Sequence, residues 1–363
     1  MVQITESQFR DEIPRIIGSW FDGEKGKVSF EKHVGKGRGA VDLVQETAHY
    51  RFVVEWKNSA STGLVADAIR NLQISLAEMP KSVKGVTTVP VIAVPFMGEA
   101  GQELCRKENI SWLDLSGNAS VSGPRLKIQI QGKPNRYKGT GRPKNVFAPK
   151  SSRIARTLLI EPDSAMTQRE LSKVTGLNEA LVGRVVKVLE REKFLWRADD
   201  GAVRVKDPAL LLDAWAESYD FDKHRIYYAF AAQRTGEAAM RSVAENLKNY
   251  QIKYAATGLA GAWMLAPFAV FRIASFYLQD EPSDALLERL RLTEQTKAGA
   301  NVWLIVPNDE GVFEGASERG KDKICCAHPV QVFLDLKYHP ERASEAQEAV
   351  RREYLNWELG KSR

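Results

Sequence analysis

Cysteine is scarce in this 363-residue sequence, and long apolar runs are absent. The three cysteines are Cys105 and the adjacent pair Cys325 and Cys326, which excludes a disulfide framework and predicts a reducing, cytoplasmic location. The most apolar stretch, 255–271, is interrupted by two glycines and a proline and is shorter than the roughly 20 residues of a membrane span. We therefore expect no membrane segment, and the acidic N-terminal residues predict no signal peptide.

Patterns that mark several common catalytic or metal sites are missing as well. The five histidines share no ligand spacing with the cysteines, which argues against a zinc site. The glycine-rich stretch 35–39 lacks the Gly-Lys-Ser/Thr ending of a phosphate-binding loop, and no Gly-x-Ser-x-Gly sequence occurs. The composition, with 44% hydrophobic and 27% charged residues, is that of a globular protein with two or three domains.

Asp and Glu are absent between Leu115 and Ile160, a stretch with ten Lys and Arg residues. Such a local excess of positive charge attracts a phosphate backbone, although the net charge of the whole chain is only +6. The prolines and glycines of residues 131–150 predict an extended basic linker. Within it, Gly-Arg142-Pro-Lys144 resembles the core of an AT-hook, which implies that Arg142 lies in the minor groove of DNA. Arg142 and Lys144 are expected to make backbone or minor-groove contacts. A solvated linker is the alternative.

Three short helices are predicted directly after the linker. An apolar-periodic helix covers 151–160, and Thr167 with Glu170 then forms a capping box that starts the second helix. Gly176 can adopt the positive φ angle that ends this helix. The third helix covers 179–193 and divides into an apolar side and a side of charged and small residues.

Two short strands, 194–197 and 202–205, follow the third helix and are joined by an Asp-Asp-Gly turn. Three helices with such a hairpin predict a winged helix-turn-helix that reads duplex DNA through its third helix. The alternative is a small helical packing module, or a winged helix that is used for protein contacts. The expected DNA contacts come from the helix starts, the third helix and the wing: Thr167, Gln168, Asn178, Glu179, Arg184, Lys187, Arg197 and Arg204.

The N-terminal residues predict an αβββαβ arrangement with three notable side chains. Asp42 lies on the second strand, and Glu55 and Lys57 lie on the third. Since strand side chains alternate, Glu55 and Lys57 point to one face of the sheet and Trp56 to the other. The predicted elements are helix 4–20, strands 27–34, 39–44 and 49–57, helix 62–79, strand 89–95, helix 99–107 and strand 112–115.

This layout, with Asp42 and the sequence Glu55-Trp-Lys57, resembles the PD-(D/E)xK superfamily of restriction endonucleases and Holliday-junction resolvases. The resemblance covers residues 1–125 and implies that Asp42 and Glu55 bind Mg²⁺ and that Lys57 assists the attacking water. The alternative is an inactive nuclease-like domain, kept for DNA binding or dimerisation, in which the three residues form a salt-bridged cluster. Further candidates that the resemblance implies are Glu12 as a ligand and Asn71 or Gln73 as phosphate contacts.

The C-terminal part alternates strands and helices and predicts an α/β domain. Residues 254–263 and 271–278 look like the opening of a nucleotidyltransferase-type fold. Active members carry Asp-x-Asp on the second of these segments, whereas residues 272–278 contain no acid, so we expect no transferase activity. The predicted strands are 225–230, 251–256, 268–278 and 301–306, and the predicted helices are 234–249, 258–265, 283–292 and 341–358.

The winged-helix pattern, Thr257-Gly258-Leu259 with Ala262-Trp263, and the segment His328 to Leu336 are together similar to AbiEi-type antitoxins. These are transcriptional regulators of bacterial type IV toxin–antitoxin systems. The resemblance covers residues 151–363 and implies a repressor that binds operator repeats upstream of its own genes, with a toxin as genetic neighbour. Family members commonly begin near their winged helix, whereas residues 1–150 precede it here.

We therefore expect a multidomain α/β protein with four parts. A restriction-endonuclease-like domain covers 1–130, a basic linker 131–150, the winged helix-turn-helix 151–220, and a degenerate nucleotidyltransferase-like α/β domain 221–363. The predicted function is DNA-binding transcriptional regulation of antitoxin type, which needs no cofactor. The alternative is a DNA nuclease that uses Mg²⁺ and is targeted by the winged helix. The expected partners are double-stranded DNA and a second copy of the chain, with the cognate toxin a genetic neighbour rather than a binding partner.

Overall fold

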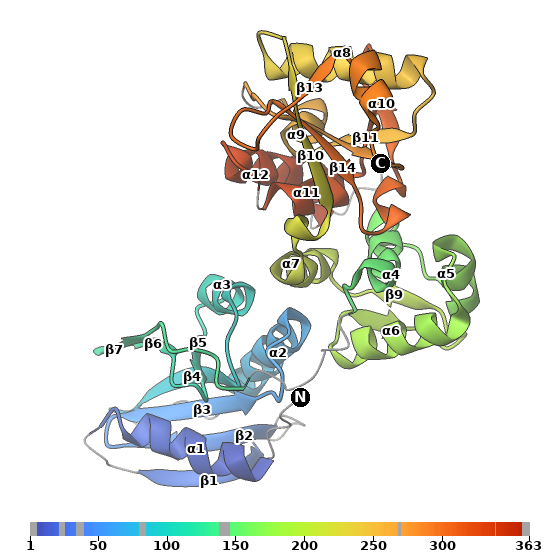
Figure 1. Cartoon of the computed structure of the whole chain (residues 1–363). Helices are drawn as coiled ribbons and strands as arrows, with labels where there is room; N and C mark the ends of the chain where they lie inside the picture. The colour runs from blue at the N-terminus through green and yellow to red at the C-terminus, as the bar shows by residue number, and fades with distance from the viewer. Residues whose placement is uncertain are drawn as a thin grey trace. The chain divides into compact units, whose positions relative to one another are not determined.

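The structure, a computed structural model, divides into two compact units. Unit 1 comprises Met1–Asn145 with Arg191–Lys193, and unit 2 comprises Val146–Glu190 with Phe194–Arg363. In Figure 1 unit 1 runs from blue to teal and unit 2 from green to red. The structure describes residues 6–21, 26–33, 40–79, 85–137, 146–267, 270–337 and 339–357.

The described strands of unit 1 form one sheet in the order β1-β2-β3-β4-β5-β6-β7. Strands β3, β4 and β5 are parallel, and all other neighbours are antiparallel. The sheet carries a hydrophobic core on each face, one with Phe9 and Ile13 of α1 and the other with Leu72 of α2 and Cys105 of α3. The elements are α1 (Glu6–Gly18), β1 (Lys27–His33), β2 (Ala40–Glu46), β3 (Tyr50–Trp56), α2 (Thr62–Glu78), β4 (Thr87–Val94), α3 (Glu99–Lys107), β5 (Ser111–Asp114), β6 (Ala119–Gly123) and β7 (Leu126–Ile130).

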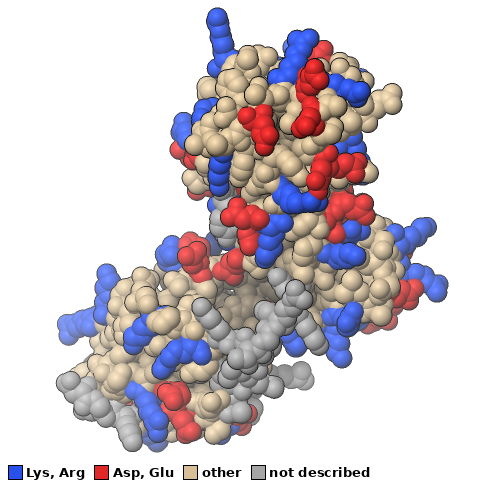
Figure 2. Space-filling model, viewed as in Figure 1, with Lys and Arg blue, Asp and Glu red and all other residues tan. Residues whose placement is uncertain are grey.

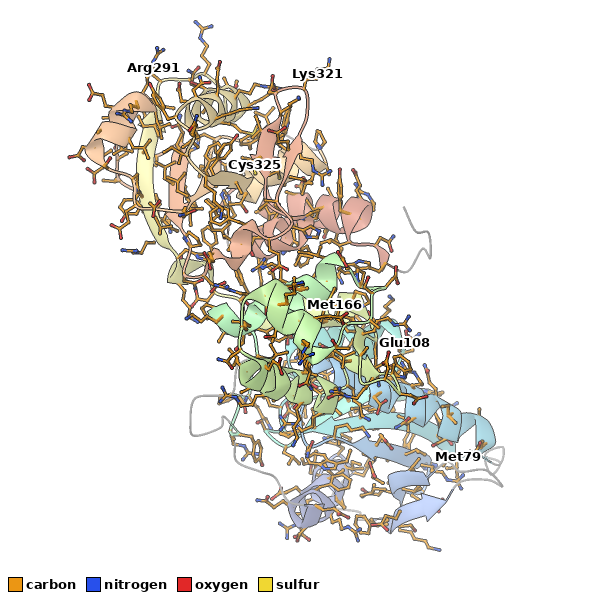
Figure 3. The ribbon with its side chains drawn as sticks, turned by 90° about the vertical axis from the view of Figure 1, so that its right-hand side faces the viewer. Met79, Glu108, Met166, Arg291, Lys321 and Cys325 are labelled. Atoms are coloured by element: carbon orange, nitrogen blue, oxygen red, sulfur yellow. The ribbon has the colours of Figure 1, made fainter. Side chains whose placement is uncertain are left out.

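Unit 2 begins with three helices and a hairpin, which we call the helix–hairpin segment (residues 149–205). The predicted capping box of Thr167 and Glu170 is present, and Gly176 ends the second helix with φ 67°. Met166, labelled in Figure 3, forms an antiparallel bridge with Val203 that ties the hairpin to the loop between the first two helices. The elements are α4 (Pro149–Ile160), α5 (Gln168–Thr175), α6 (Glu179–Arg191), β8 (Leu195–Arg197) and β9 (Val203–Val205).

The rest of unit 2 is an α/β layer structure around a sheet of order β13-β10-β14-β12-β11-β16-β15. The predicted strand over 268–278 begins only at Ala274, and residues 268–269 lie outside the described residues. The elements are α7 (Pro208–Ser218), η1 (Phe221–Lys223), β10 (Arg225–Ala231), α8 (Gly236–Asn249), β11 (Tyr254–Thr257), α9 (Gly258–Leu265), β12 (Ala274–Leu278), α10 (Asp284–Arg289), β13 (Leu292–Glu294), β14 (Val302–Val306), η2 (Glu310–Phe313), β15 (Ser317–Arg319), β16 (Ile324–Cys326), α11 (Pro329–Leu336) and α12 (Ala343–Tyr354).

The helix–hairpin segment and the α/β part share one hydrophobic core, which extends from Ile154 to Leu355. Polar contacts also join them. Arg153 of α4 donates from Nε and one NH2 group to both carboxylate oxygens of Asp309, at 2.7 and 2.8 Å. Arg156 of the same helix donates to the side-chain oxygen of Gln331 at 2.5 Å. Unit 2 is therefore continuous across residue 220, and the four-part division of the chain stays a prediction.

Across the described residues, none of the helices combines the length and the apolar character that a bilayer span requires. The three cysteines are free thiols, and those of Cys105 and Cys326 are buried.

Candidate functional site

The exposed face of α6 carries two cations that have no partner among the described residues. Arg184 and Lys187 are exposed, and no hydrogen bond or ion pair engages either of them in the described part of the chain. The opposite face of the helix is buried through Val182, Val185, Val186 and Leu189. Figure 2 shows Lys and Arg side chains projecting from the part of the molecule that Figure 1 labels α5 and α6. This is the division between a packed and a presented side that the sequence predicts for a recognition helix.

The other predicted contacts on these helices make intramolecular bonds. The backbone N–H and the hydroxyl of Thr167 donate to one carboxylate oxygen of Glu170, at 2.7 and 2.8 Å. Asn178 accepts the N–H of Leu181 at 2.9 Å and so caps α6. The Glu179 carboxylate lies 3.9 Å from Arg169. These bonds use the groups with which Thr167 and Asn178 were expected to contact DNA.

Gln168 lies beside the exposed face of α6. A methyl group built on Gly183 would lie 3.0 Å from the side-chain oxygen of Gln168. The absence of a side chain at Gly183 therefore allows the Gln168 amide to lie close to α6, near Arg184 and Lys187.

The two predicted arginines of the β8–β9 hairpin have different surroundings. Arg197 donates to both carboxylate oxygens of Glu190 at 2.6 and 2.7 Å and to the carbonyl of Gly201 at 2.7 Å. The guanidinium of Arg204 lies over the ring of Trp196, 5.6 Å from its centroid. Trp196 is 49% exposed. Trp196 was not among the predicted contacts, although strand alternation from the buried Leu195 places it on the solvent face. Arg142 and Lys144 lie outside the described residues.

A second site lies in unit 1, where Asp42, Glu55 and Lys57 meet. The Lys57 ammonium donates to one oxygen of Glu55 at 2.8 Å, and the Asn71 amide of α2 donates to the same oxygen at 3.4 Å. Asp42 accepts the backbone N–H of Trp56 at 2.6 Å. The pairing of Leu43 with Val54 places Asp42 level with Glu55 on neighbouring strands.

The predicted alternation along β3 is confirmed. Trp56 stacks on Phe9 of α1, with ring centroids 4.8 Å apart, whereas Glu55 bonds to Asn71 of α2. Since α1 and α2 cover opposite faces of the sheet, the Trp56 ring lies away from the acidic site. Gln73, the other predicted phosphate contact, donates instead to Glu108, labelled in Figure 3, at 3.2 Å.

The two carboxylates of this site are held in an environment that disfavours their charge. Burial raises the pKa of Asp42, partly offset by the Trp56 N–H and the Lys57 charge. Burial likewise raises the pKa of Glu55, and the hydrogen bond from Lys57 opposes that shift. Each negative charge therefore lacks full compensation, and hard oxygen donors of this kind fit Mg²⁺.

The acid of α1 whose charge acts on Asp42 is Glu6, together with Glu31 of β1. The resemblance had implied a different acid of α1, Glu12, as a further metal ligand. Both Glu6 and Glu31 are bound by Arg10. No cluster of three or more His, Cys, Asp or Glu side chains arranged to hold a metal occurs among the residues that the structure describes. Asp42 and Glu55 thus supply two carboxylates and no third.

A buried polar cluster in the α/β part surrounds Asp335, which is fully buried. Its carboxylate accepts hydrogen bonds from Thr257, from Tyr219 (2.5 Å), from Tyr277 (2.9 Å) and from the Gln331 amide (2.7 Å). Burial raises the pKa of Asp335 to about 6. Strand β12 lies in the segment that the sequence likened to the acid-bearing strand of nucleotidyltransferases. It has the sequence Ala-Ser-Phe-Tyr-Leu and is buried throughout.

Comparison with known proteins bears on the C-terminal part of the chain. Residues 204–356 match the family described as transcriptional regulator, AbiEi antitoxin, type IV TA system. The resemblance to AbiEi antitoxins is thereby confirmed for this segment. By that description, this segment is similar to transcriptional regulators of antitoxin type. It begins within β9, so α4, α5, α6 and β8 precede the matched segment.

Two other comparisons add little. No curated protein matches this chain. Among solved structures, a repair endonuclease from Pyrococcus abyssi matches with 21% identity and a TM-score of 0.23, over 31% of this chain and 48% of that chain. This chain thus spans about half the length of that endonuclease, and at this TM-score the match carries no structural argument.

Proposed function

We propose that the chain is an antitoxin-type transcriptional regulator whose helix–hairpin segment is a winged helix that reads duplex DNA. The observation that carries this proposal is the division of α6 into a buried apolar face and an exposed face. The exposed face carries Arg184 and Lys187, two cations without a partner in the part of the chain that the structure describes. A helix that enters the major groove needs both features, because one face must hold it on its domain while the other contacts base edges and phosphates.

The surrounding contacts divide the predicted residues by role. Arg184 and Lys187 contact DNA directly, Gln168 lies beside them, and Arg204 contacts the backbone from the wing together with Trp196. Asn178 and Thr167 position the helix starts, Glu179 pairs with Arg169, and Arg197 holds the wing on α6. Arg142 and Lys144 of the linker add minor-groove contacts, as their sequence implies. We further propose that a second copy of the chain binds a repeated operator and that the cognate toxin is encoded nearby.

Fluorescence anisotropy tests this function. It measures how tightly the protein binds a labelled DNA fragment from the region upstream of its gene, over a range of salt concentrations. Lys187→Ala should weaken binding to every sequence and reduce the salt slope by about 1, because one phosphate contact is lost. Arg184→Ala should cost about 1–3 kcal/mol, mainly at one base position. Lys321→Ala, which removes an exposed charge from the α/β part, is the matched control. If all three variants bind like the wild type, α6 does not read DNA.

A second candidate function is Mg²⁺-dependent DNA cleavage by unit 1. It is favoured by the meeting of two incompletely compensated carboxylates, Asp42 and Glu55, with the ammonium of Lys57. When bound, Mg²⁺ would supply Lewis-acid stabilisation of the charge that develops on a phosphate. Asp42 and Glu55 would hold the ion, and Lys57 would orient a water molecule while Asn71 fixes the Glu55 carboxylate.

Relaxation of supercoiled plasmid with Mg²⁺ tests this second function. Lys57→Ala should abolish cutting, whereas Lys27→Ala, an exposed lysine at the start of β1, should leave it unchanged. Calorimetric titration of the protein with Mn²⁺ alone should give binding that Asp42→Asn removes. Cutting that persists in the Asp42→Asn variant would show that this site is not its source.

A further inference from the structure

The strand directions of unit 1 bring the carboxyl ends of five strands to one edge of its sheet. Strands β3, β4 and β5 are parallel. Strand β7 runs the same way because β6 is antiparallel to both β5 and β7, and β1 does so because β2 is antiparallel to both β1 and β3. We call this edge, toward which the arrowhead of β3 points in Figure 1, the carboxyl edge. Lys57 follows β3 here and donates its backbone N–H to Ala93 of β4 at 3.0 Å. The acidic site therefore lies at the carboxyl edge.

Lys133, which follows β7, is fixed at the same edge. Its backbone N–H donates to the side-chain oxygen of Asn118 at 2.8 Å, and the Asn118 amide donates back to the Lys133 carbonyl at 3.1 Å. Asn118 is itself held by the buried Asp114 at the end of β5. The Lys133 side chain lies over Gly117, where a built methyl group would be 2.7 Å from the ammonium nitrogen. Gly117 has φ 95°, so this turn favours glycine.

Arg136 is held in place near Lys133 at the carboxyl edge. Its backbone N–H donates to the hydroxyl of Ser116 at 3.2 Å, and one terminal guanidinium nitrogen donates to the carbonyl of Leu115 at 2.5 Å. Leu115 follows β5 and donates its own N–H to Val94 of β4 at 3.1 Å. A guanidinium has five N–H donors, so this bond orients Arg136 and leaves donors for a phosphate.

The spacing and charge at this edge suit a polyanion. Neighbouring strands are roughly 4.8 Å apart, which places the end of β5 about 10 Å from the end of β3. Measured along the axis of a DNA duplex, that distance corresponds to about three nucleotide steps of one strand, at a rise of roughly 3.4 Å each. Helices α2 and α3 also begin at this edge, because each follows a strand that ends there, and a helix start carries a partial positive charge. Glu99, at the start of α3, is an exposed acid at the same edge.

We propose that Lys133 and Arg136, together with Lys57, form a strip along the carboxyl edge of unit 1 that binds the phosphate backbone of duplex DNA. The proposal rests on the proposed function only in taking duplex DNA as the partner. It requires neither that α6 reads bases nor that Asp42 and Glu55 support cleavage. Phosphate contacts carry no sequence information, so binding at the strip is independent of sequence and strongly dependent on salt.

The test uses the full-length chain with Arg184→Ala and Lys187→Ala, so that α6 contributes little, and a short labelled duplex of arbitrary sequence. Adding Lys133→Gln and Arg136→Gln should weaken binding roughly tenfold and reduce the salt slope by about 2. The matched control adds Arg125→Gln and Lys127→Gln. These residues lie in or beside the β6–β7 turn, at the opposite edge, where Pro124 accepts the Tyr50 hydroxyl at 3.2 Å. The Arg125→Gln, Lys127→Gln control should change neither the DNA affinity nor the salt slope.

Equal weakening by both pairs would overturn the strip, because the effect would then follow net charge alone. If adding Lys133→Gln and Arg136→Gln leaves the affinity of the Arg184→Ala, Lys187→Ala background unchanged, the strip is also wrong. That result would leave the role of α6 intact. If the wild-type chain binds no DNA at all, the proposed function and the strip both fail. Since Arg136→Gln removes a bond to Leu115, Lys133→Arg with Arg136→Lys serves as a second pair. It keeps the charge and should keep the salt slope if the strip is correct.

Discussion

At the scale of single residues, the two arginines of the β8–β9 hairpin should respond differently to the same substitution. Arg197→Gln breaks a bidentate pair with Glu190, so it should lower the free energy of unfolding by up to about 1 kcal/mol, the range of partly exposed pairs. Arg204→Gln removes a cation over Trp196 that has no carboxylate partner in the described residues. It should weaken DNA binding and leave stability nearly unchanged. Thermal unfolding and anisotropy on both variants check this. The reverse pattern would assign the DNA contact to Arg197.

Gly183 offers a substitution that separates stability from binding. Alanine in a helix interior is favoured over glycine by about 1 kcal/mol. The added methyl group meets only the flexible end of Gln168, at 3.0 Å, which can move. We therefore expect Gly183→Ala to raise the unfolding free energy by up to about 1 kcal/mol and to weaken DNA binding by filling the exposed face of α6. Urea unfolding and anisotropy measure the two effects. A variant that binds DNA as well as the wild type would exclude Gly183 from the interface.

Some residue-level features follow from local pattern, and others require the fold. The alternation along β3 was enough to place Glu55 and Lys57 on one face and Trp56 on the other. The pairing of Arg197 with Glu190 was not predictable in the same way, because the two residues belong to different elements. The same holds for Gln73, whose partner Glu108 is far away in sequence.

At the scale of elements, helices with local end signals were predicted closely. The capping box of Thr167 and the glycine at 176 set both ends of α5, because those signals act within a few residues. Strands β6, β7, β13 and β15 were missed. Two of them have only three residues, and all four depend on partners that the sequence does not identify.

The start of α5 can be tested against another helix start with the same cap. Thr167 accepts from Glu170 N–H, and Thr235 accepts from Ala238 N–H at the start of α8. Replacing either threonine by alanine should cost about 1 kcal/mol of stability. Only Thr167→Ala should also weaken DNA binding, because α5 lies beside α6 in the helix–hairpin segment. Equal DNA affinity for the two variants would show that the position of α5 does not matter for binding.

At the scale of the whole molecule, each unit has its own hydrophobic core. A fragment of residues 146–363 should therefore fold by itself and keep sequence-specific DNA binding through α6. It should lose the sequence-independent, salt-dependent component that we assign to the strip on unit 1. Thermal unfolding with anisotropy on specific and arbitrary duplexes checks both. An unfolded fragment would mean that unit 2 depends on unit 1 for its stability.

The charged and titratable groups buried in unit 2 predict how its stability changes with pH. Burial lowers the pKa of His224, His328 and His339 from 6.5 to about 4. Between these values the unfolded chain binds more protons than the folded one, so each histidine destabilises unit 2 as the pH falls from about 6.5 to about 4. Asp335 acts in the opposite direction, because its pKa is raised from 3.8 to about 6 and the folded state binds the proton first. Burial also raises the pKa of Glu314, which acts in the same direction as Asp335. Three histidines therefore oppose two carboxyl groups, and the unfolding free energy of unit 2 should decrease over this interval.

Urea unfolding of the 146–363 fragment, followed by tryptophan fluorescence at a series of pH values, measures this dependence. His224→Gln should make the decrease shallower, because one group that takes up a proton on unfolding is removed. Asp335→Asn should make it steeper, because one opposing group is removed. Both variants change buried hydrogen bonds, so the informative quantity is the slope against pH rather than the stability at one pH. A stability that rises as the pH falls would mean that the raised pKa values of Asp335 and Glu314 outweigh the lowered pKa values of the three histidines.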